Sequence, residues 1–249
     1  MTVVIGHRGN SSVAPQNTLA AFEAAWRAGA HAIEIDVQLT ADGQVVVIHD
    51  DTVDATTDGA GEVRSMTADE VRGLDAGSWF SPVFAGQRVP TFDEVLDFLL
   101  ARPGLDLLLE VKGEWTAEQV RPLTRAVASA GLQSRTIAQS FWPGTVAALR
   151  EAAPSLRRGL LIAELHDGLI GLCRGLGVVA CNPHGQVLRD HPGLVDELRE
   201  AGVVVMVWTL NEPDQWAAAT AAGVDAIITD RPDRLAGWLA GRPVRAVAA

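Results

Sequence analysis

The sequence predicts an α/β fold, a closed parallel (β/α)8 barrel of the TIM type with a small insertion after its second strand. Eight apolar, strand-like segments, each followed by a helix-like segment, begin at Val3, Ala32, Leu107, Thr136, Gly159, Val178, Val203 and Asp225. This alternation is typical of a parallel barrel, and the 249 residues suit one such domain. A doubly wound open sheet is the alternative, but no G-x-G-x-x-G pattern follows the first strand.

Composition and charge argue against several classes of protein. The chain is 48% hydrophobic and 20% charged, with a net charge of −11, so we expect neither a nucleic-acid-binding surface nor strong attraction to anionic lipid. No apolar run approaches the ~20 residues of a membrane span, and the first strand follows Met1 too closely for a cleavable signal peptide. Cys173 and Cys181 lack zinc or redox spacing and are expected to be buried thiols. We therefore expect a cytoplasmic protein. The sequence does not determine its oligomeric state, and a homo-oligomer is possible.

The first strand, Val3 to Ile5, ends in the polar segment Gly6-His7-Arg8-Gly9. Polar residues between glycines directly after a buried strand suit a loop that approaches a ligand. Asn17 or Thr18 can then cap a helix that stops at Gly29. The apolar face of this helix is predicted to consist of Leu19, Phe22, Ala25 and Trp26.

A hairpin is predicted next, with strands Ala32 to Leu39 and Val45 to His49. Asp42-Gly43 suits a tight turn, and a two-residue turn there pairs residues whose numbers sum to 85. Asp36 would then face His49 across the pair, with Cβ atoms ~5 Å apart, and Glu34 would share the face of Asp36. Two carboxylates and one imidazole would form a single cluster.

A surface hairpin could carry the same three residues on its solvated face without any chemistry. Apolar residues occupy the alternate positions of the first strand, however: Ile33, Ile35 and Val37. This pattern indicates a strand buried on both faces. Carboxylates that point into such an interior are costly unless they are paired or bind a metal ion, so we favour a functional site.

An insertion, about residues 41–90, interrupts the alternation of strands and helices after the second strand. We expect mostly irregular loop with one short helix, Thr67 to Arg72, lying over the cluster as a cap. Trp79 and Phe80 are either core residues or part of a substrate wall, and the sequence leaves this open.

The remaining strands and helices follow in regular order. Further helices are expected over Thr91–Leu100, Pro143–Ala153, Gly168–Leu176, His191–Ala201, Pro213–Ala222 and Pro232–Leu239. Further strands are expected over Leu107–Lys112, Thr136–Phe141, Gly159–Ala163, Val178–Asn182, Val203–Thr209 and Asp225–Thr229. The barrel domain then spans 1–241, and 242–249 form a frayed tail.

Polar residues gather at the carboxyl ends of the strands, where barrels of this type carry their active sites. They are His7, Glu34, Asp36, His49, Glu110, Lys112 and Trp208. Glu110 and Lys112 share a strand face; their mutual salt bridge is the structural alternative, although neighbours two apart on a strand pair poorly.

Three acidic side chains in one place raise one another's pKa or hold a cation, since two carboxylates ~4 Å apart repel by roughly 4 kcal/mol at an effective dielectric of 20. Oxygen ligands favour Mg²⁺ or Ca²⁺ over zinc. Two histidines could transfer protons, and Arg8 and Lys112 could bind anionic oxygens. These groups together suit the cleavage of a phosphodiester.

The motifs resemble the glycerophosphodiester phosphodiesterase family, in order from residue 5 to about 232. They are Gly6-His7-Arg8-Gly9, Pro15-Gln16-Asn17-Thr18, Ile33 to Thr40, His49-Asp50-Asp51-Thr52, Leu74 to Phe80, Glu110-Val111-Lys112, Val207 to Asn211 and Ile227 to Asp230. The resemblance implies a TIM barrel that splits glycerophosphodiesters, such as glycerophosphocholine, into glycerol 3-phosphate and an alcohol.

By this resemblance Glu34, Asp36 and Glu110 would hold one divalent cation, and His7 and His49 would be the acid–base pair. Arg8 and Lys112 would bind the phosphate, and Trp208 would pack against the glycerol. The family usually has Glu at the position of Gln16, so a charge is lost there. Two alternatives remain: cleavage of lipid-bearing diesters, which a wide apolar groove near Trp79 and Phe80 would favour, and a non-catalytic barrel that binds phosphoesters.

Overall fold

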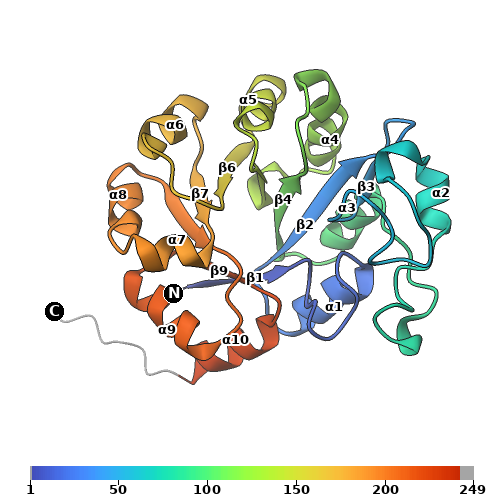
Figure 1. The fold of residues 1–249 in the computed structure, drawn as a ribbon, viewed down its shortest axis with the longest axis horizontal. Coiled ribbons are helices and arrows are strands. Elements are labelled where there is room, and N and C mark those ends of the chain that lie inside the picture. The colour runs from blue at the N-terminus through green and yellow to red at the C-terminus, as the bar shows by residue number, and fades with distance from the viewer. Residues whose placement is uncertain (1, 242–249) are drawn as a thin grey trace.

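The computed structural model describes residues 2–241, and within them the strands form a closed parallel barrel surrounded by helices (Figure 1). The strand order is β1-β9-β8-β7-β6-β5-β4-β2-β3, and an additional β1–β2 pairing closes the ring. Only β3 runs antiparallel to its neighbour. The predicted TIM-type fold is therefore confirmed.

The strands are β1 (Val3–His7), β2 (Ala32–Leu39), β3 (Val45–Val47), β4 (Asp106–Val111), β5 (Thr136–Ser140), β6 (Arg157–Ile162), β7 (Ala180–Pro183), β8 (Val204–Val207) and β9 (Ala226–Thr229). The helices are α1 (Leu19–Arg27), α2 (Ala68–Gly73), α3 (Phe92–Leu100), α4 (Ala117–Ser129), α5 (Pro143–Ala152), α6 (Leu169–Leu176), α7 (Gly185–Asp190), α8 (Leu194–Glu200), α9 (Pro213–Ala222) and α10 (Pro232–Ala240). Short 3₁₀ turns lie at Val63–Ser65, Pro82–Phe84 and Gln133–Arg135.

Threonine hydroxyls cap the amino ends of the first four helices, where backbone N–H groups lack partners within the helix. Thr18 accepts from the backbone N–H of Ala21, and Thr67, Thr91 and Thr116 each form a reciprocal capping box with the third residue of their helices. The sequence therefore specifies locally where these helices begin.

Two apolar layers hold the barrel together. Outward-facing strand residues such as Ile33, Ile35 and Leu109 pack beneath the helices in one large core. A smaller cluster fills the barrel interior and consists of Ile5, Ala32, Leu108, Ala180, Met206, Ala226 and Ile228. Because strand side chains alternate between these layers, the polar residues at the carboxyl ends of the strands lie beside the inner cluster.

The β2–β3 hairpin differs from the prediction by one residue in register. Val37 pairs with Val47 and Leu39 with Val45, so the paired numbers sum to 84, and the prediction that Asp36 directly faces His49 is wrong. The turn has three residues, because Gly43 N–H donates to the Thr40 carbonyl and Thr40 N–H to the Gln44 carbonyl. Gly43 has φ 73°, the left-handed conformation that ends such a turn.

The strand β3 also ends at Val47, two residues before the predicted end. The side-chain amide of Gln38 donates to the carbonyls of Ile48, His49 and Asp50 at 3.3, 3.0 and 2.6 Å. These bonds hold the chain in a non-strand path after β3. In the observed register a regular strand would turn His49 to the outer face, so this early end is what allows His49 to reach the inner pocket.

The insertion lies beside the barrel around β3 and α2, at the right in Figure 1. It has its own small core of Val46, Ile48, Val53, Val63, Ala68, Val71, Ala76 and Val89. Only His49 of this segment lines the pocket at the acidic cluster. The insertion after β2 therefore contributes His49 to the pocket, and its role as a cap over the cluster stays a prediction.

Several boundaries differ from those predicted. The helix α7 was not predicted; it follows β7 directly, and the predicted helix over His191–Ala201 is the shorter α8. Trp26, expected on the apolar face of α1, is 39% exposed, and the guanidinium of Arg102 lies over its ring at 5.2 Å. Cys173 and Cys181 are buried free thiols, as predicted.

Among residues 2–241, no helix combines the length and apolar character that crossing a membrane requires. The predicted tail, 242–249, lies outside the described residues.

Candidate active site

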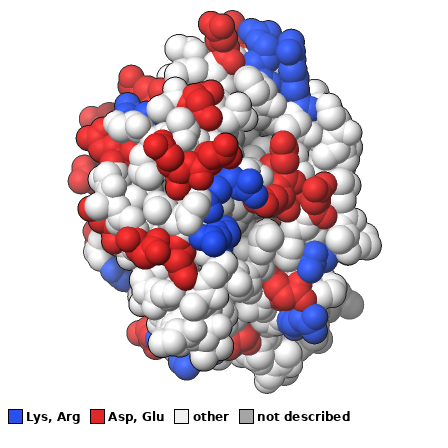
Figure 2. All heavy atoms as spheres, turned by 90° about the vertical axis from the view of Figure 1, so that its right-hand side faces the viewer, with Lys and Arg blue, Asp and Glu red and all other residues white. Residues whose placement is uncertain are grey.

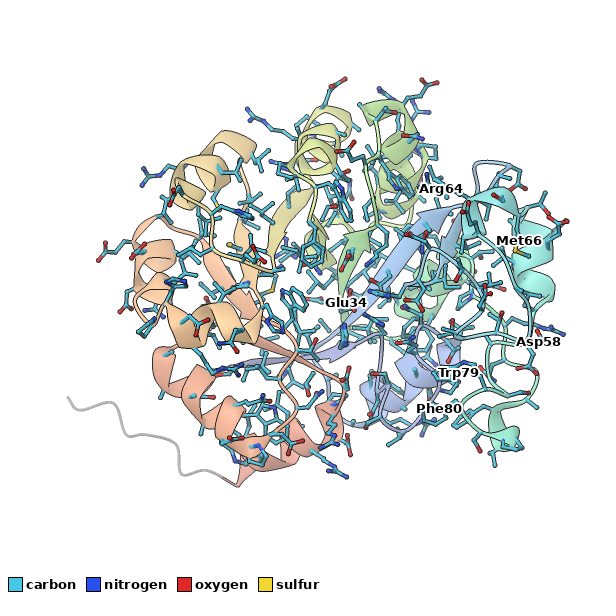
Figure 3. The ribbon with its side chains drawn as sticks, viewed as in Figure 1. Glu34, Asp58, Arg64, Met66, Trp79 and Phe80 are labelled. Carbon is cyan, nitrogen blue, oxygen red and sulfur yellow. The ribbon has the colours of Figure 1, made fainter. Side chains whose placement is uncertain are left out.

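Three buried carboxylates converge inside the barrel. Glu34 and Asp36 project from β2, and Glu110 projects from the neighbouring β4, where it is the register partner of Asp36. One carboxylate oxygen from each lies within 4.8 Å of the other two, and the three residues are only 2%, 1% and 6% exposed. The structure thus brings together all three predicted metal ligands, with Glu34 near the centre of the barrel (Figure 3).

Two cationic side chains lie against this trio. Arg8 Nε is 3.2 Å from Asp36 Oδ2, and Lys112 Nζ is 3.8 Å from Asp36 Oδ1 and 3.0 Å from Glu110 Oε1. The ion pair between Lys112 and Glu110, which the sequence argued against, therefore forms. This ion pair can form because β4 ends at Val111. Lys112 is therefore not held in strand geometry, and its side chain can approach the Glu110 carboxylate.

The charges perturb one another unequally. Burial, then Asp36 and Glu110, raise the pKa of Glu34 well above its ordinary value, and burial followed by the Asp36 charge raises the pKa of Glu110 to about 7. Burial also opposes the charge of Asp36, but Arg8, His49, Lys112 and an Asn17 hydrogen bond hold its pKa below the ordinary value. Asp36 is therefore the carboxylate that keeps its charge most readily.

This donor set fits a hard divalent cation. Three carboxylates from two strands converge, and two of them have raised pKa values because no counter-charge sufficiently offsets their burial and repulsion. A cation among them would favour their ionised forms. Oxygen-only donors suit Mg²⁺ or Ca²⁺.

His7 and His49 line one pocket together with Arg8, Glu34 and Glu110. His7 Nδ1 lies 2.6 Å from Asp230 Oδ1, and His49 Nδ1 lies 2.7 Å from Asp50 Oδ1. Each carboxylate thereby favours a proton on Nδ1 and leaves Nε2 as the ring nitrogen available to the pocket. Burial lowers the pKa of His49, although the nearby Asp36 charge opposes that shift.

Asp230 is held more firmly than Asp50. Asn211 donates to its Oδ2 at 2.6 Å and Ser11 to its Oδ1 at 3.1 Å. Although burial opposes the charge, hydrogen bonds from His7, Asn211 and Ser11 lower the pKa of Asp230 to about 2. Asp230 is thus an anionic, immobile partner for His7 at neutral pH.

The backbone after β1 adopts an unusual conformation at the site. Arg8 and Asn17 are the non-glycine residues with positive φ among those described, at 57° and 56°, and Asn17 N–H donates to the Arg8 carbonyl at 3.0 Å. This arrangement lets Arg8 N–H donate to Glu34 Oε2 at 3.1 Å, while the Asn17 side chain donates to Asp36 Oδ2 at 2.9 Å. Such strain is tolerated where the surrounding contacts fix it.

The other wall of the pocket is mainly apolar. Trp208 and Phe141 meet edge to face with ring centroids 5.3 Å apart, and Leu161 and Ile228 complete this wall beside Gln139. The pocket volume is about 40 Å³. Trp208 therefore lines the same pocket as the charged residues, after the end of β8, and its contact with the glycerol stays a prediction.

A larger cavity of about 410 Å³ has Lys112 in its lining. It lies between the hairpin, the 3₁₀ turn that carries Arg64 and the start of α4, and it is lined by Gln38, Leu39, Thr40, Ala41, Gly43, Arg64, Lys112, Glu114, Trp115, Gln119 and Pro122. Trp79 and Phe80 line neither cavity; they contact each other in the insertion, at the lower right in Figure 3. Trp79 is 42% exposed, so neither of its two predicted roles is met.

Gln16 accepts a hydrogen bond from Arg8 Nη1 at 2.8 Å. The residue therefore orients the guanidinium that also pairs with Asp36, and a neutral amide suffices for this contact.

Figure 2 views the side on which the insertion lies, where basic side chains gather at a hollow amid scattered acidic ones.

Sequence reasoning gave Asn17 only a possible helix-capping role, and it gave no role to Gln38, Asp50, Gln139, Asn182, Asn211 or Asp230. Five of them stand within the quoted motifs, which marked them without indicating a contact: Asn17, Gln38, Asp50, Asn211 and Asp230. Gln139 carried only a weak signal, since Thr136 and Ser140 of the same short strand are polar as well. Asn182 stands near the end of its strand, where polar residues are common, and had no signal.

Comparison with known proteins agrees with this geometry. The sequence model of the glycerophosphoryl diester phosphodiesterase family matches residues 7–234. A glycerophosphodiester phosphodiesterase of Caldanaerobacter subterraneus is 38% identical over 237 residues, covering 94% of this chain and 96% of that protein.

Solved structures show the same fold. A glycerophosphodiester phosphodiesterase from Agrobacterium tumefaciens superposes with a TM-score of 0.83 at 33% identity, covering 95% of this chain and 100% of that one. An Oleispira antarctica phosphodiesterase in complex with the product sn-glycerol-3-phosphate superposes with a TM-score of 0.86 at 27% identity, covering 97% and 98%. With the family match over nearly its whole length, this chain belongs to the glycerophosphoryl diester phosphodiesterase family.

Proposed function

We propose that the protein is a divalent-cation-dependent glycerophosphodiester phosphodiesterase, a single domain over 1–241. It hydrolyses diesters such as glycerophosphocholine or glycerophosphoethanolamine to sn-glycerol 3-phosphate and an alcohol. The observation that carries the proposal is the convergence of Glu34, Asp36 and Glu110 on the pocket that both histidines line. The product bound to the Oleispira antarctica relative supports the choice of substrate.

Glu34, Asp36 and Glu110 would hold Mg²⁺ or Ca²⁺, which when bound neutralises phosphate charge during the reaction. Arg8 and Lys112 bind phosphate oxygens; both already lie within 4 Å of the acidic trio, so anionic oxygens entering the site find cationic donors in place. Trp208 packs against the carbon atoms of the glycerol.

His7 and His49 carry the proton transfers. One Nε2 removes a proton from the nucleophile, and the other donates a proton to the departing alkoxide, which is a poor leaving group near neutral pH. Asp230 contacts Nδ1 of His7, and Asp50 contacts Nδ1 of His49. The nucleophile is water or the glycerol 2-hydroxyl; in the second case a cyclic glycerophosphate forms first, and a slow variant would accumulate it.

Cleavage of lipid-bearing diesters is the less favoured alternative. The groove for a lipid chain was expected near Trp79 and Phe80, and these residues line neither the pocket at the acidic cluster nor the larger cavity. A non-catalytic barrel is disfavoured because both histidines line one pocket with Glu34 and Glu110, and Asp36 lies with these two carboxylates in one cluster.

The deciding experiment measures release of glycerol 3-phosphate from glycerophosphocholine. We expect turnover that a chelator abolishes and that Mg²⁺ or Ca²⁺ restores. Undiminished activity after complete removal of divalent cations would contradict the metal requirement, and inactivity on all glycerophosphodiesters under metal-replete conditions would contradict the function.

A further inference from the structure

A buried pair of amides lies inside the barrel below the pocket. Gln139 on β5 and Asn182 on β7 are 1% and 0% exposed, and Asn182 Nδ2 donates to Gln139 Oε1. The intervening strand β6 carries Gly159 between them. A Cβ atom at Gly159 would lie 3.3 Å from both Gln139 Cβ and Asn182 Nδ2, so the glycine leaves the room in which the two side chains meet.

The pair retains unused hydrogen-bonding capacity. Within residues 2–241, Asn182 Oδ1 is buried without a partner, and Gln139 forms no side-chain bond besides the one that its Oε1 accepts. A buried polar atom without a partner destabilises the fold, and native proteins rarely keep one without a reason. The side-chain N–H group of Gln139 and the side-chain oxygen of Asn182 can therefore each form a further hydrogen bond.

The position of Gln139 indicates what this partner is. Gln139 is the register partner of the predicted metal ligand Glu110 and lines the pocket next to Phe141, Leu161, Trp208 and Ile228. Asn182 is tied to the same wall, because its carbonyl accepts from Trp208 Nε1 at 2.8 Å. Beside Glu110 in this pocket, Gln139 is thus a polar residue next to apolar ones.

We propose that Gln139, oriented by Asn182, recognises a hydroxyl of the glycerol moiety and makes the enzyme selective for glycerol over alcohols that lack it. A hydroxyl both accepts and donates, so it can accept from Gln139 Nε2 and still offer its proton to an amide oxygen. A neutral amide suits a neutral ligand group. Sites built to bond a substrate hydroxyl discriminate strongly against analogues without it. This inference rests on the proposed phosphodiesterase function.

The test compares two substrates in two variants. Glycerophosphocholine carries both free hydroxyls, and ethylphosphocholine carries none. We expect Gln139→Met to lower kcat/KM for glycerophosphocholine by about 10- to 100-fold, because the substrate hydroxyl is then buried without its hydrogen-bond partner. The same substitution should change kcat/KM for ethylphosphocholine by less than about threefold. Gln133→Met, an exposed position at the opposite end of β5, is the matched control and should change neither.

Equal losses on both substrates, or no loss on glycerophosphocholine, would overturn the inference. Binding gives a second readout that does not depend on the variant's folding or on turnover. Wild-type protein should bind sn-glycerol 3-phosphate at least about tenfold more tightly than ethyl phosphate in calorimetry, and equal affinities would overturn the inference as well. If the wild type cleaves neither diester but keeps this binding preference, the proposed function fails while the hydroxyl site stands.

Discussion

At the scale of single residues, the site depends on which charges the barrel can stabilise. Three carboxylates at 6% exposure or less could not all remain ionised without help. The positive charges of Arg8 and Lys112 stabilise mainly the ionised form of Asp36, and the pKa values of Glu34 and Glu110 stay raised. The residues that would bind a cation are therefore unevenly charged before it arrives.

The contact between His7 and Asp230 leads to a first prediction. His7→Ala should lower kcat by ~10²–10⁴-fold, since it removes a proton-transfer group. Asp230→Asn should lower kcat by roughly 10–100-fold with little change in KM, because an amide no longer fixes the proton on Nδ1. Steady-state kinetics with glycerophosphocholine measure both.

Asp69→Asn is the control for the loss of one negative charge, because Asp69 lies exposed in the first turn of α2. It should leave kcat unchanged. Wild-type turnover in Asp230→Asn would show that the short contact to His7 has no part in catalysis. Turnover as low as that of His7→Ala, with a lowered unfolding temperature, would indicate a structural role instead.

At the scale of elements, the hairpin turn and Gln38 together decide where His49 lies. The three-residue turn sets a register in which a continued strand would carry His49 to the outer face. Gln38 instead holds the carbonyls of residues 48–50 with one amide. The position of a catalytic candidate thus depends on a side chain that does not line its pocket.

Substitution of Gln38 tests this dependence. Gln38→Leu keeps the volume but removes the donor, so we expect kcat to fall by about 10–100-fold as His49 loses its placement. Stabilisation by added divalent cation should persist, because Glu34, Asp36 and Glu110 are unchanged. Kinetics and thermal unfolding with and without Mg²⁺ measure the two effects.

Gln44→Leu, an exposed residue of the same hairpin whose side chain makes no hydrogen bond within the described chain, is the matched control. It should retain activity. Unimpaired kcat in Gln38→Leu would mean that the insertion's own core alone positions His49.

At the scale of the whole molecule, folding stability and cation binding are linked through Glu110. Without a cation, burial raises its pKa from 4.5 to about 7, so between these values the folded state binds more protons than the unfolded state. Stability is then lost as the pH rises through this window. A cation that replaces the proton should stabilise the fold more at higher pH.

We therefore expect the unfolding temperature of the metal-free protein to fall between pH about 5 and about 8 more steeply than that of Glu110→Gln. We also expect Mg²⁺ or Ca²⁺ to raise the wild-type unfolding temperature more at pH about 8 than at pH about 6. Thermal unfolding with chelator and with each ion measures both. An increase that is equal at the two pH values, or that Glu110→Gln retains in full, would rule out this linkage.

The sequence by itself determined the barrel fold and most of the polar residues that gather at the carboxyl ends of its strands. Strand alternation has a period of two and helix caps act over three residues, so both can be read locally. This is why Glu34, Asp36 and Glu110 could be predicted to gather at the strand ends. The same reasoning was wrong for the hairpin, because a two-residue and a three-residue turn fit the same Asp-Gly dipeptide and only the folded pairing chooses between them.

Only the tertiary structure decided which partners these residues have. Asp230 meets His7 across 223 positions of the chain, and Gln139 meets Asn182 across the glycine of a third strand. No local period connects such residues; closing the barrel brings first and last strands together and sets which inward side chains touch. The physical reason is that hydrogen bonds between distant residues depend on strand register around the whole ring, which no segment of the sequence specifies alone.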